Sequence, residues 1–385
     1  MKINSNKLNK RGVIIIRDLI IPEMAGGIEK QVIWYATKYI QKGWRPIFVV
    51  GNLASKNSPF KKMAESSGAI WISTKHKQKK NFKELYRIIS QLCRIYPIKI
   101  IQTHTFYESV CMRLFRIFHP SIKHISKVHT HIDCSTIPSF KKKLYHLIDW
   151  LTSFGVDHII AISELVKKEM VRSRIFPEKI TVIPNGVVSF DIKKHRITET
   201  EKPLISKLAV IGTIDGRKGH EILLEAMKML KNEIQIKALF FGSLISTYEK
   251  KIKDKIEELG LQNQVIFIGF CPNLSSAIKD IEVIVLPSFI EGEPLSLLEA
   301  MSVGKLIIST NVDAIPEIIS DGINGYLIPP GRPEILAKKL RWIFTTPSKF
   351  HVRIRRQACR NFEEKFNVER MLKKSIRVIE KVISN

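Results

Sequence analysis

Short apolar runs alternate along the chain with longer stretches whose apolar residues recur every three or four positions. The short runs have the length of buried strands, and the longer stretches have the period of amphipathic helices. The expected strands are Val13–Ile16, Pro46–Val50, Ala69–Ile72, Ile98–Gln102, Lys123–Val128, His158–Ala161, Ile180–Ile183, Leu208–Ile211, Ile236–Phe241, Val265–Ile268, Val283–Leu286, Leu306–Ser309 and Tyr326–Ile328. The expected helices include Ile28–Gln41, Phe82–Tyr96, Phe140–Thr152, His220–Leu230, Thr247–Leu259, Leu295–Val303 and Pro333–Phe344. This alternation predicts βαβ units and therefore an α/β fold with parallel sheets.

The alternation stops once, between Pro184 and Pro203. This stretch begins with Pro184-Asn185-Gly186 and continues through polar residues without apolar periodicity, which is typical of a linker. We therefore predict a first doubly wound domain at residues 1–187, a linker at 188–203, a second at 204–365, and a C-terminal helix at 366–385 that could pack back on the first. We expect the domains to face each other across a cleft, with ligands beyond the carboxyl ends of the strands.

Composition places the chain among ordinary globular proteins. It has 385 residues, of which 44% are hydrophobic and 26% charged, which excludes collagen-like and wholly disordered chains. No apolar run approaches the roughly 18 residues that span a bilayer. The apolar run Val13–Ile16 is interrupted at once by Arg17 and Asp18, which predicts a cytoplasmic start without a secretory signal. The five cysteines form no C-x-x-C pair, which favours a reducing compartment over a zinc ribbon or a disulfide scaffold.

Positive charge is concentrated in the first half of the chain. Residues 1–190 carry 32 Lys and Arg against 12 Asp and Glu, whereas residues 191–385 carry 31 against 24. Such an excess predicts an anionic partner: a membrane surface, nucleic acid or a phosphorylated substrate. A lysine-rich composition that serves only solubility explains it equally well. No nucleic-acid-binding module or set of interleaved aromatics accompanies the charge, so we expect no nucleic-acid partner.

The segment after the expected strand Val283–Leu286 combines features of an anion site. Gly292 allows a tight turn, and Pro294 suits the first position of a helix, where its missing N–H has no partner anyway. The unpaired N–H groups of such a first turn favour a diphosphate. Glu291 and Glu299 flank this turn, and carboxylates beside phosphates are natural acceptors for sugar hydroxyls. The plainer alternative is a charged helix start, since acidic residues favour helix N-termini.

Glu291 to Glu299 matches the E-x7-E signature of retaining glycosyltransferases of family 4, which have the GT-B fold, and the sequence resembles this family over essentially its whole length. Further matching segments are Pro184-Asn185-Gly186-Val187, which is similar to P-N-G-V, Ile211–Gly219, which is similar to the G-R-L-x-x-x-K-G loop, and the segments Gly304–Thr310 and Asp321–Gly325. The resemblance is strong over residues 180–330 and weaker before them. It implies two Rossmann-like domains, a nucleotide-diphosphate sugar as donor, and no metal or other cofactor.

The resemblance also implies roles for individual residues. Glu299 would hold the ribose of the donor, Glu291 would contact the transferred sugar, and Lys218 would neutralise the diphosphate. The complete set of implied donor-binding residues is Gly26, Gly27, Gly212, Arg217, Lys218, Gly292, Pro294, Leu295 and Glu299.

Two positions depart from the family pattern. Thr213 stands where the family has the arginine of G-R-L. Arg217 could supply that positive charge instead, from a different position. Glu293 adds a third carboxylate, which should weaken donor binding unless it faces the acceptor or solvent.

Two motifs follow strands of the first half. Gly26-Gly27-Ile28-Glu29 opens a helix and resembles the family's G-G-x-E loop near the donor phosphates, although most Gly-Gly pairs are only flexible turns. His129-Thr130-His131-Ile132-Asp133 is compatible with a metal site, a structural strand end, or the family's active-site histidine. For the last role His131 is the first choice and His129 the second, and His104 also ends a strand. No D-x-D occurs, which favours metal-free stabilisation of the leaving diphosphate.

The expected helix over residues 140–152 allows two interpretations. It begins with Lys141-Lys142-Lys143, and Leu144, Leu147, Ile148 and Leu151 share one face with Tyr145 and Trp150 nearby. Such a helix can lie on an anionic bilayer, or it can pack on its own sheet with its lysines in solvent.

Together these observations predict a retaining glycosyltransferase. It would transfer a sugar to a polyprenyl-linked, glycolipid or surface-polysaccharide acceptor, from the cytoplasm or the inner face of the membrane. A nucleotide-sugar epimerase of the same architecture, and a metal-dependent hydrolase using His129, His131 and Asp133, are the alternatives.

Overall fold

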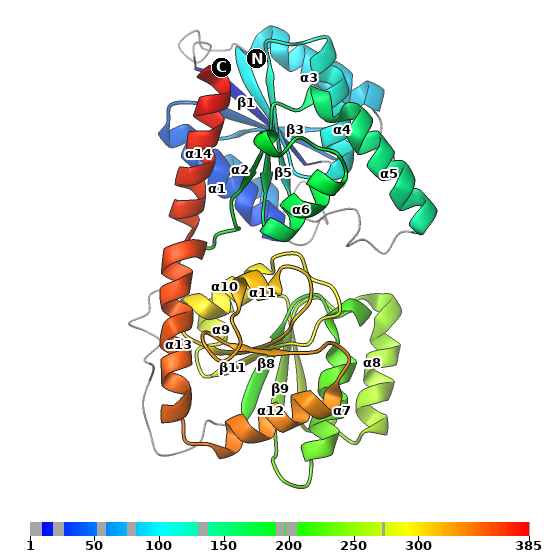
Figure 1. Cartoon of the computed structure of the whole chain (residues 1–385), viewed down its shortest axis with the longest axis vertical. Helices are drawn as coiled ribbons and strands as arrows, with labels where there is room; N and C mark the ends of the chain where they lie inside the picture. The colour runs from blue at the N-terminus through cyan, green and yellow to red at the C-terminus, as the bar shows by residue number, and fades with distance from the viewer. Residues whose placement is uncertain are drawn as a thin grey trace. The chain divides into compact units, whose positions relative to one another are not determined.

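The chain divides into two compact units, which we describe separately (Figure 1). Unit 1 comprises Met1–Pro184 and Glu369–Asn385, and unit 2 comprises Asn185–Val368. The structure, a computed structural model, describes residues 10–17, 27–51, 59–74, 82–129, 138–189, 197, 206–271 and 274–384. No helix among these residues is long and apolar enough to cross a membrane.

Unit 1 is built on a seven-stranded parallel sheet of order β3-β2-β1-β4-β5-β6-β7. Its strands are β1 (Gly12–Arg17), β2 (Arg45–Val50), β3 (Ile70–Ser73), β4 (Ile98–Thr103), β5 (Lys123–Val128), β6 (His158–Ala161) and β7 (Ile180–Val182). Residues Val13–Ile16 of β1 and 46–50 of β2 are apolar and buried without alternation, because helices cover both faces of the sheet and successive side chains each meet a core. The strand order reverses between β1 and β4, which makes the carboxyl ends of these strands the expected ligand position.

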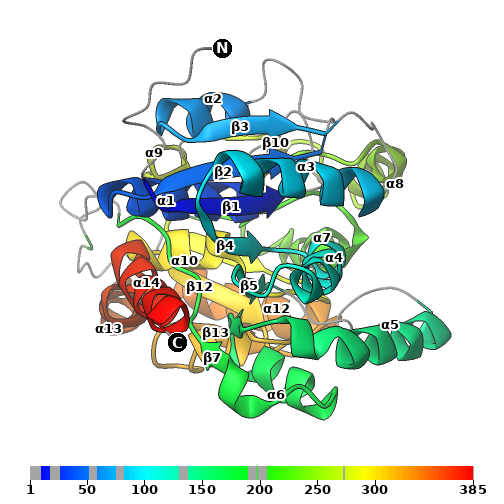
Figure 2. The ribbon, with the colours of Figure 1, turned by 90° about the horizontal axis from the view of Figure 1, so that it is seen from above.

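Helices on each face of this sheet bury different sides of the same strands (Figure 2). They are α1 (Gly27–Gln41), α2 (Pro59–Ser66), α3 (Phe82–Ile95), α4 (Phe106–Ile117), α5 (Ser139–Thr152) and α6 (Glu164–Arg172). Ile14, Ile101, Ile89 of α3 and Phe115 of α4 belong to one buried cluster. The neighbouring strand residue Gln102 points to the other face, where its Oε1 accepts a hydrogen bond from Tyr39 of α1 at 2.6 Å.

Unit 1 is completed by α14 (Val368–Ser384), which follows unit 2 in the sequence and packs beside α1. The Tyr35 hydroxyl of α1 and the Ser375 hydroxyl of α14 lie 2.7 Å apart, and both side chains are buried. Two ion pairs of 3.1 Å, Lys38–Glu369 and Lys42–Glu380, join the same helices at the surface. The hydrophobic face of α14 is therefore part of the core of the first unit.

Unit 2 repeats the architecture with six parallel strands in the order β10-β9-β8-β11-β12-β13. The strands are β8 (Lys207–Ile211), β9 (Lys237–Phe241), β10 (Val265–Gly269), β11 (Val283–Leu286), β12 (Leu306–Thr310) and β13 (Tyr326–Ile328). The helices are α7 (His220–Leu230), α8 (Ser246–Glu258), α9 (Leu274–Ala277), α10 (Leu295–Ser302), α11 (Ile315–Ile318), α12 (Pro333–Thr345) and α13 (Lys349–Asn361), and a π-helical turn, Phe362–Phe366, precedes α14. The strand order reverses between β8 and β11.

The predicted fold class is confirmed, because both sheets are parallel and doubly wound. Every expected strand is present within one or two residues of its predicted ends. The linker predicted at 188–203 lies mostly outside the described residues, which include only 188, 189 and 197 of it.

Removing a large side chain from the buried face of α14 should weaken unit 1. Ile379 is fully buried, so Ile379→Ala should cost about 2–5 kcal/mol through lost burial and an incompletely collapsed cavity. Hydrogen exchange in α1 measures the effect, and Lys374→Ala, on the exposed face of the same helix, is the control. Equal protection of α1 in both variants would contradict the packing described here.

Candidate functional site

The loops that follow β8 and β11 in unit 2 are held together at the point where strand order reverses. A β-carbon added at Gly219, whose φ is +65°, would lie 1.9 Å from the carbonyl oxygen of Pro287, so only glycine permits this approach. The backbone N–H of Phe289 donates to the carbonyl of Arg217 at 2.8 Å. These contacts place the loop containing Lys218 against the loop containing Glu291.

Lys218 and Glu291 form an ion pair within this pair of loops. The Lys218 Nζ lies 2.7 Å from Glu291 Oε1, and the same oxygen accepts a hydrogen bond from Ser288 Oγ at 2.7 Å. The Glu291 backbone N–H donates to Asp313 Oδ2 at 2.7 Å. The carboxylate of Glu291 is almost fully buried and the lysine is about one-fifth exposed. A buried anion thus lies next to a cation that solvent can reach.

The helix after this turn, α10, begins at Leu295, which is the predicted first residue of this helix. Pro294 has ψ of 117° and caps α10 from outside, so the prediction that it occupies the first helical position was wrong. The first N–H groups of α10 have no partner within the helix, which suits an anion. Gly292, Pro294 and Leu295 are half-buried at this end. Glu299 is a buried residue of the second turn of α10.

Glu293, the additional carboxylate of this turn, is buried and contacts the backbone of the interdomain motif. Its Oε2 accepts a hydrogen bond from the Asn185 N–H at 2.5 Å. It therefore does not face solvent, which is one of the two arrangements that the sequence suggested for it. The contact fixes the start of unit 2 to the loop that carries Glu291.

The loop after β8 holds the remaining predicted residues. Gly212 has φ of +152°, and a β-carbon at Gly242 would lie 1.9 Å from the Gly212 carbonyl oxygen, so the loop after β9 packs tightly against it. Arg217 is 60% exposed and pairs with Asp215, the residue that caps this turn, at 2.7 Å. Arg217 is thus held within its own loop, and a place for it at a diphosphate remains a prediction.

Unit 1 has a second group of polar residues at the corresponding sheet edge. Gly27 is the first residue of α1, and Glu29 in the first turn pairs with Arg17 at the end of β1, with Nε and Oε1 2.8 Å apart. Sequence reasoning did not include Arg17 among the candidate residues, although its place at the carboxyl end of β1, beside the strand reversal, was a usable signal. Gly26 lies outside the described residues.

A chain of buried hydrogen bonds leads to His129 at the end of β5. Gln102 Nε2 lies 3.1 Å from His104 Nε2, and His104 Nδ1 lies 3.1 Å from His129 Nε2. Because Tyr39 donates to the Gln102 carbonyl oxygen, the Gln102 amide must donate to His104. His104 then donates from Nδ1, and neutral His129 carries its proton on Nδ1. His131, the first choice for the catalytic histidine, lies outside the described residues, as does Asp133.

Burial keeps these histidines neutral. Desolvation lowers the pKa of His104 and of His129 well below the usual range, and the charges of Lys127 and Arg17 lower both further. Desolvation, with Arg113 nearby, also lowers the pKa of His124 on β5 to about 3. Among the described residues, no group of three or more His, Cys, Asp and Glu is placed to hold a metal ion.

Two doubly wound parallel sheets, each with polar residues at the reversal of strand order, define a protein of two Rossmann-like α/β domains, and family models identify it further. Residues 25–189 match Glycosyltransferase Family 4, and residues 190–361 match Glycosyl transferases group 1. The two matches together cover well over half of the chain, which therefore belongs to the glycosyltransferases of this two-domain family.

Individual relatives share fewer than 30% of their residues with this chain over the matched segments. The chain is 27% identical over 220 residues to the uncharacterized glycosyltransferase MJ1607 of Methanocaldococcus jannaschii, which covers 53% of this chain and 55% of that protein. It is 28% identical over 193 residues to the putative colanic acid biosynthesis glycosyltransferase WcaL of Salmonella typhimurium, with 48% and 47% covered. The chain thus spans about half the length of these relatives. The structure of Anabaena Alr3699/HepE in complex with UDP-glucose has the same fold, with a TM-score of 0.78, 19% identity, and 96% and 99% covered.

The buried histidines predict that unit 1 loses stability in mild acid. Below about pH 6.5 the unfolded chain binds protons at His104, His124 and His129, whereas the folded chain cannot until the pH falls through their lowered pKa values. As the pH is lowered below about 6.5, the free energy of unfolding should therefore decrease by up to about 1.4 kcal/mol per pH unit for each of these histidines. Urea unfolding between neutral pH and pH 4 measures the slope, which should be shallower in His124→Asn. A flat profile would show that the histidines titrate normally.

Proposed function

We propose that this protein is a retaining glycosyltransferase that moves a sugar from a nucleotide-diphosphate sugar to a lipid-linked or surface-polysaccharide acceptor. The observation that carries the proposal is the Lys218–Glu291 ion pair, which lies at the strand reversal of unit 2 beside the start of α10. The family of the chain supports the transfer of a sugar. Retention rests on the resemblance of Glu291 to Glu299 to the E-x7-E signature.

The donor would bind unit 2 through three kinds of contact. The N–H groups at the start of α10 and the Lys218 ammonium would neutralise the diphosphate, and Glu299 would accept hydrogen bonds from the ribose. The UDP-glucose complex of the Anabaena protein supports a nucleotide-sugar donor. The absence of D-x-D from the sequence favours neutralisation by these groups rather than by a metal ion.

The ion pair provides the charge pattern that the reaction requires. As the bond between sugar and diphosphate breaks, positive charge develops on the sugar and negative charge on the phosphate. Glu291 is held rigidly by Ser288 and by its backbone bond to Asp313, so it would stabilise the sugar without reorganising. Lys218 would stabilise the phosphate. On donor binding the Lys218–Glu291 ion pair would separate: Lys218 would contact the diphosphate and Glu291 the sugar. Each buried charge would then keep a polar partner, which limits the free-energy cost of burying it.

The leaving diphosphate would also take the proton of the acceptor hydroxyl. The attack then occurs on the face from which the diphosphate leaves, which retains the anomeric configuration. The predicted role of the first unit is to bind the acceptor. Its net positive charge favours a polyprenyl-phosphate or anionic glycolipid, and the similarity to WcaL, a putative colanic acid biosynthesis glycosyltransferase, favours a growing polysaccharide. A nucleotide-sugar epimerase would instead release an altered sugar without any acceptor.

Donor affinity should depend on Glu299 and Lys218. Replacing either by alanine removes hydrogen bonds to a charged group and should weaken binding by about 1.5–3 kcal/mol. Isothermal titration calorimetry with UDP-, GDP- and ADP-sugars measures the loss. Glu258→Ala and Lys228→Ala, at exposed positions of the same unit, are the matched controls. Unchanged donor affinity in both site variants would remove these residues from the donor site.

Turnover should depend on Glu291 and His131 rather than on metal. Glu291→Gln and His131→Ala should each lower the transfer rate at saturating donor by roughly 100-fold or more, the scale of one lost transition-state contact. EDTA should leave the wild-type rate unchanged. Near-normal turnover in both variants would exclude the two side chains from the reaction. Loss of activity in EDTA that zinc restores would favour the hydrolase alternative built on His129 and His131.

A further inference from the structure

Helix α5 in unit 1 has its apolar side facing outward. Six large apolar side chains of α5 and the turn after it are between 40% and 69% exposed: Phe140, Leu144, Leu147, Trp150, Leu151 and Phe154. They recur at intervals of three and four residues, so they form one continuous stripe. We call this set the outer stripe of α5. The expectation that this helix simply packs its apolar face on its own sheet is therefore wrong for Leu144, Leu147 and Leu151.

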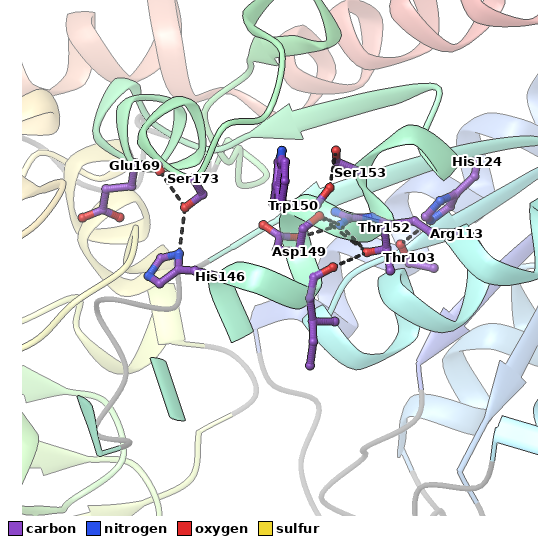
Figure 3. Close-up of polar contacts among 11 residues, drawn as sticks. Thr103, Arg113, His124, His146, Asp149, Trp150, Thr152, Ser153, Glu169 and Ser173 are labelled. Carbon is purple, nitrogen blue, oxygen red and sulfur yellow. Dashed lines mark hydrogen bonds and ion pairs between the residues drawn. The ribbon is translucent and has the colours of Figure 1, made fainter. Parts of the chain in front are cut away.

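The inner side of the same helix is polar and firmly anchored (Figure 3). Arg113 of α4 and Asp149 are both buried and form an ion pair of 2.5 Å. Arg113 also donates to the Asp149 carbonyl at 3.1 Å and to the Thr152 hydroxyl at 3.3 Å. Because breaking one side of a buried pair leaves an uncompensated charge, α5 cannot easily rotate to bury its outer stripe.

The end of α5 fixes the same orientation. A β-carbon at Gly155 would lie 2.4 Å from the Arg113 carbonyl oxygen, so the turn after α5 packs backbone to backbone on α4. On the other side His146 Nδ1 lies 2.8 Å from Ser173 Oγ beside α6, as Figure 3 also shows. The outer stripe is thus held outward by contacts on both flanks.

Basic side chains surround the outer stripe. Lys141, Lys142 and Lys143 lie within the first five residues of α5, where the helix dipole disfavours cations, so helix stability does not explain them. Arg174, which follows α6, lies over the Trp150 ring at 5.4 Å, and Arg172 beside it is exposed. The one carboxylate within α5, Asp149, is buried in its ion pair. An apolar stripe with cations at its end and edge, and no exposed carboxylate on the helix, complements an anionic bilayer.

We propose that α5 docks the protein on an anionic membrane, with its outer stripe in the acyl–headgroup boundary and Lys141–Lys143 against lipid phosphates. If the α5 helices of two copies of the chain packed together, their apolar stripes could contact each other. The lysines would then find no acidic partner on the opposite α5, because its one carboxylate, Asp149, is buried. The suggested purpose of the docking, to bring unit 1 to a lipid-linked acceptor, rests on the proposed function. The docking itself follows from the exposed side chains.

Vesicle binding by the full chain tests the proposal. Wild-type protein should sediment at low salt with vesicles of equal parts phosphatidylglycerol and phosphatidylcholine, but not with phosphatidylcholine alone, and high salt should weaken binding. Leu147→Glu with Leu151→Glu should reduce binding by roughly 100-fold or more, because two apolar contacts are lost. Lys141→Gln with Lys143→Gln should reduce it by about 25-fold, or about fivefold per charge. Brominated lipids should quench Trp150, and Trp150→Phe should remove that quenching.

Matched controls separate this surface from general effects. Met229→Glu on α7, also half-exposed, and Lys228→Gln with Lys250→Gln should bind vesicles as wild type does. Absence of wild-type binding, or unchanged binding in the Leu147/Leu151 variant, would overturn the proposal. A dimer that this variant dissociates, without vesicle binding, would identify a second copy as the occupant and also overturn it. Calorimetry with the nucleotide sugar on the same proteins separates the two proposals, since failure to bind donor would count against the proposed function alone.

Discussion

Burial of both faces of each parallel sheet is the constraint on which the rest of this protein depends. A strand with helices on both sides can expose chemistry only near its ends, so the candidate groups among the described residues lie at the carboxyl end of a strand or in the loop and helix that follow it. Arg17, His104 and His129 follow or close β1, β4 and β5, and Lys218, Ser288 and Asp313 follow β8, β11 and β12. The two units therefore present similar edges, each with an ion pair, Arg17–Glu29 in unit 1 and Lys218–Glu291 in unit 2, and unit 1 adds neutral histidines.

Defined hydrogen bonds hold several polar groups in place at these edges. In unit 1 the direction of donation runs from Tyr39 through Gln102 and His104 to His129, which specifies the tautomer of the last ring. In unit 2 the Glu291 carboxylate and its backbone N–H are both engaged. Preorganisation of this kind is what an electrostatic mechanism needs, because dipoles that are already oriented do not have to turn during the reaction.

The strands and the class of fold could be predicted from sequence because a strand buried on both faces leaves a local signal, a short continuous apolar run. Lys218 and Glu291 could be predicted by their motifs. Asp313 and Ser288 could not, because one-letter patterns do not report which loop ends pack together. The contact of Glu293 could not be predicted for a similar reason: its partner, the N–H of Asn185, lies more than a hundred residues away in the sequence. The outward face of α5 depends on a buried arginine of another helix, which periodicity alone cannot register.

The return of α14 to unit 1 also bears on how the protein is made. Unit 2 is in effect inserted between two parts of unit 1, since residues 185–368 separate the sheet from the helix that covers it. During synthesis the first seven strands emerge long before Ser375 and Ile379, so the surface of α1 that contacts them stays uncovered while unit 2 is completed. The second unit can fold as an uninterrupted segment, whereas the first must wait for a contact between residues more than three hundred positions apart, which closes slowly and leaves apolar surface open to aggregation or to a chaperone.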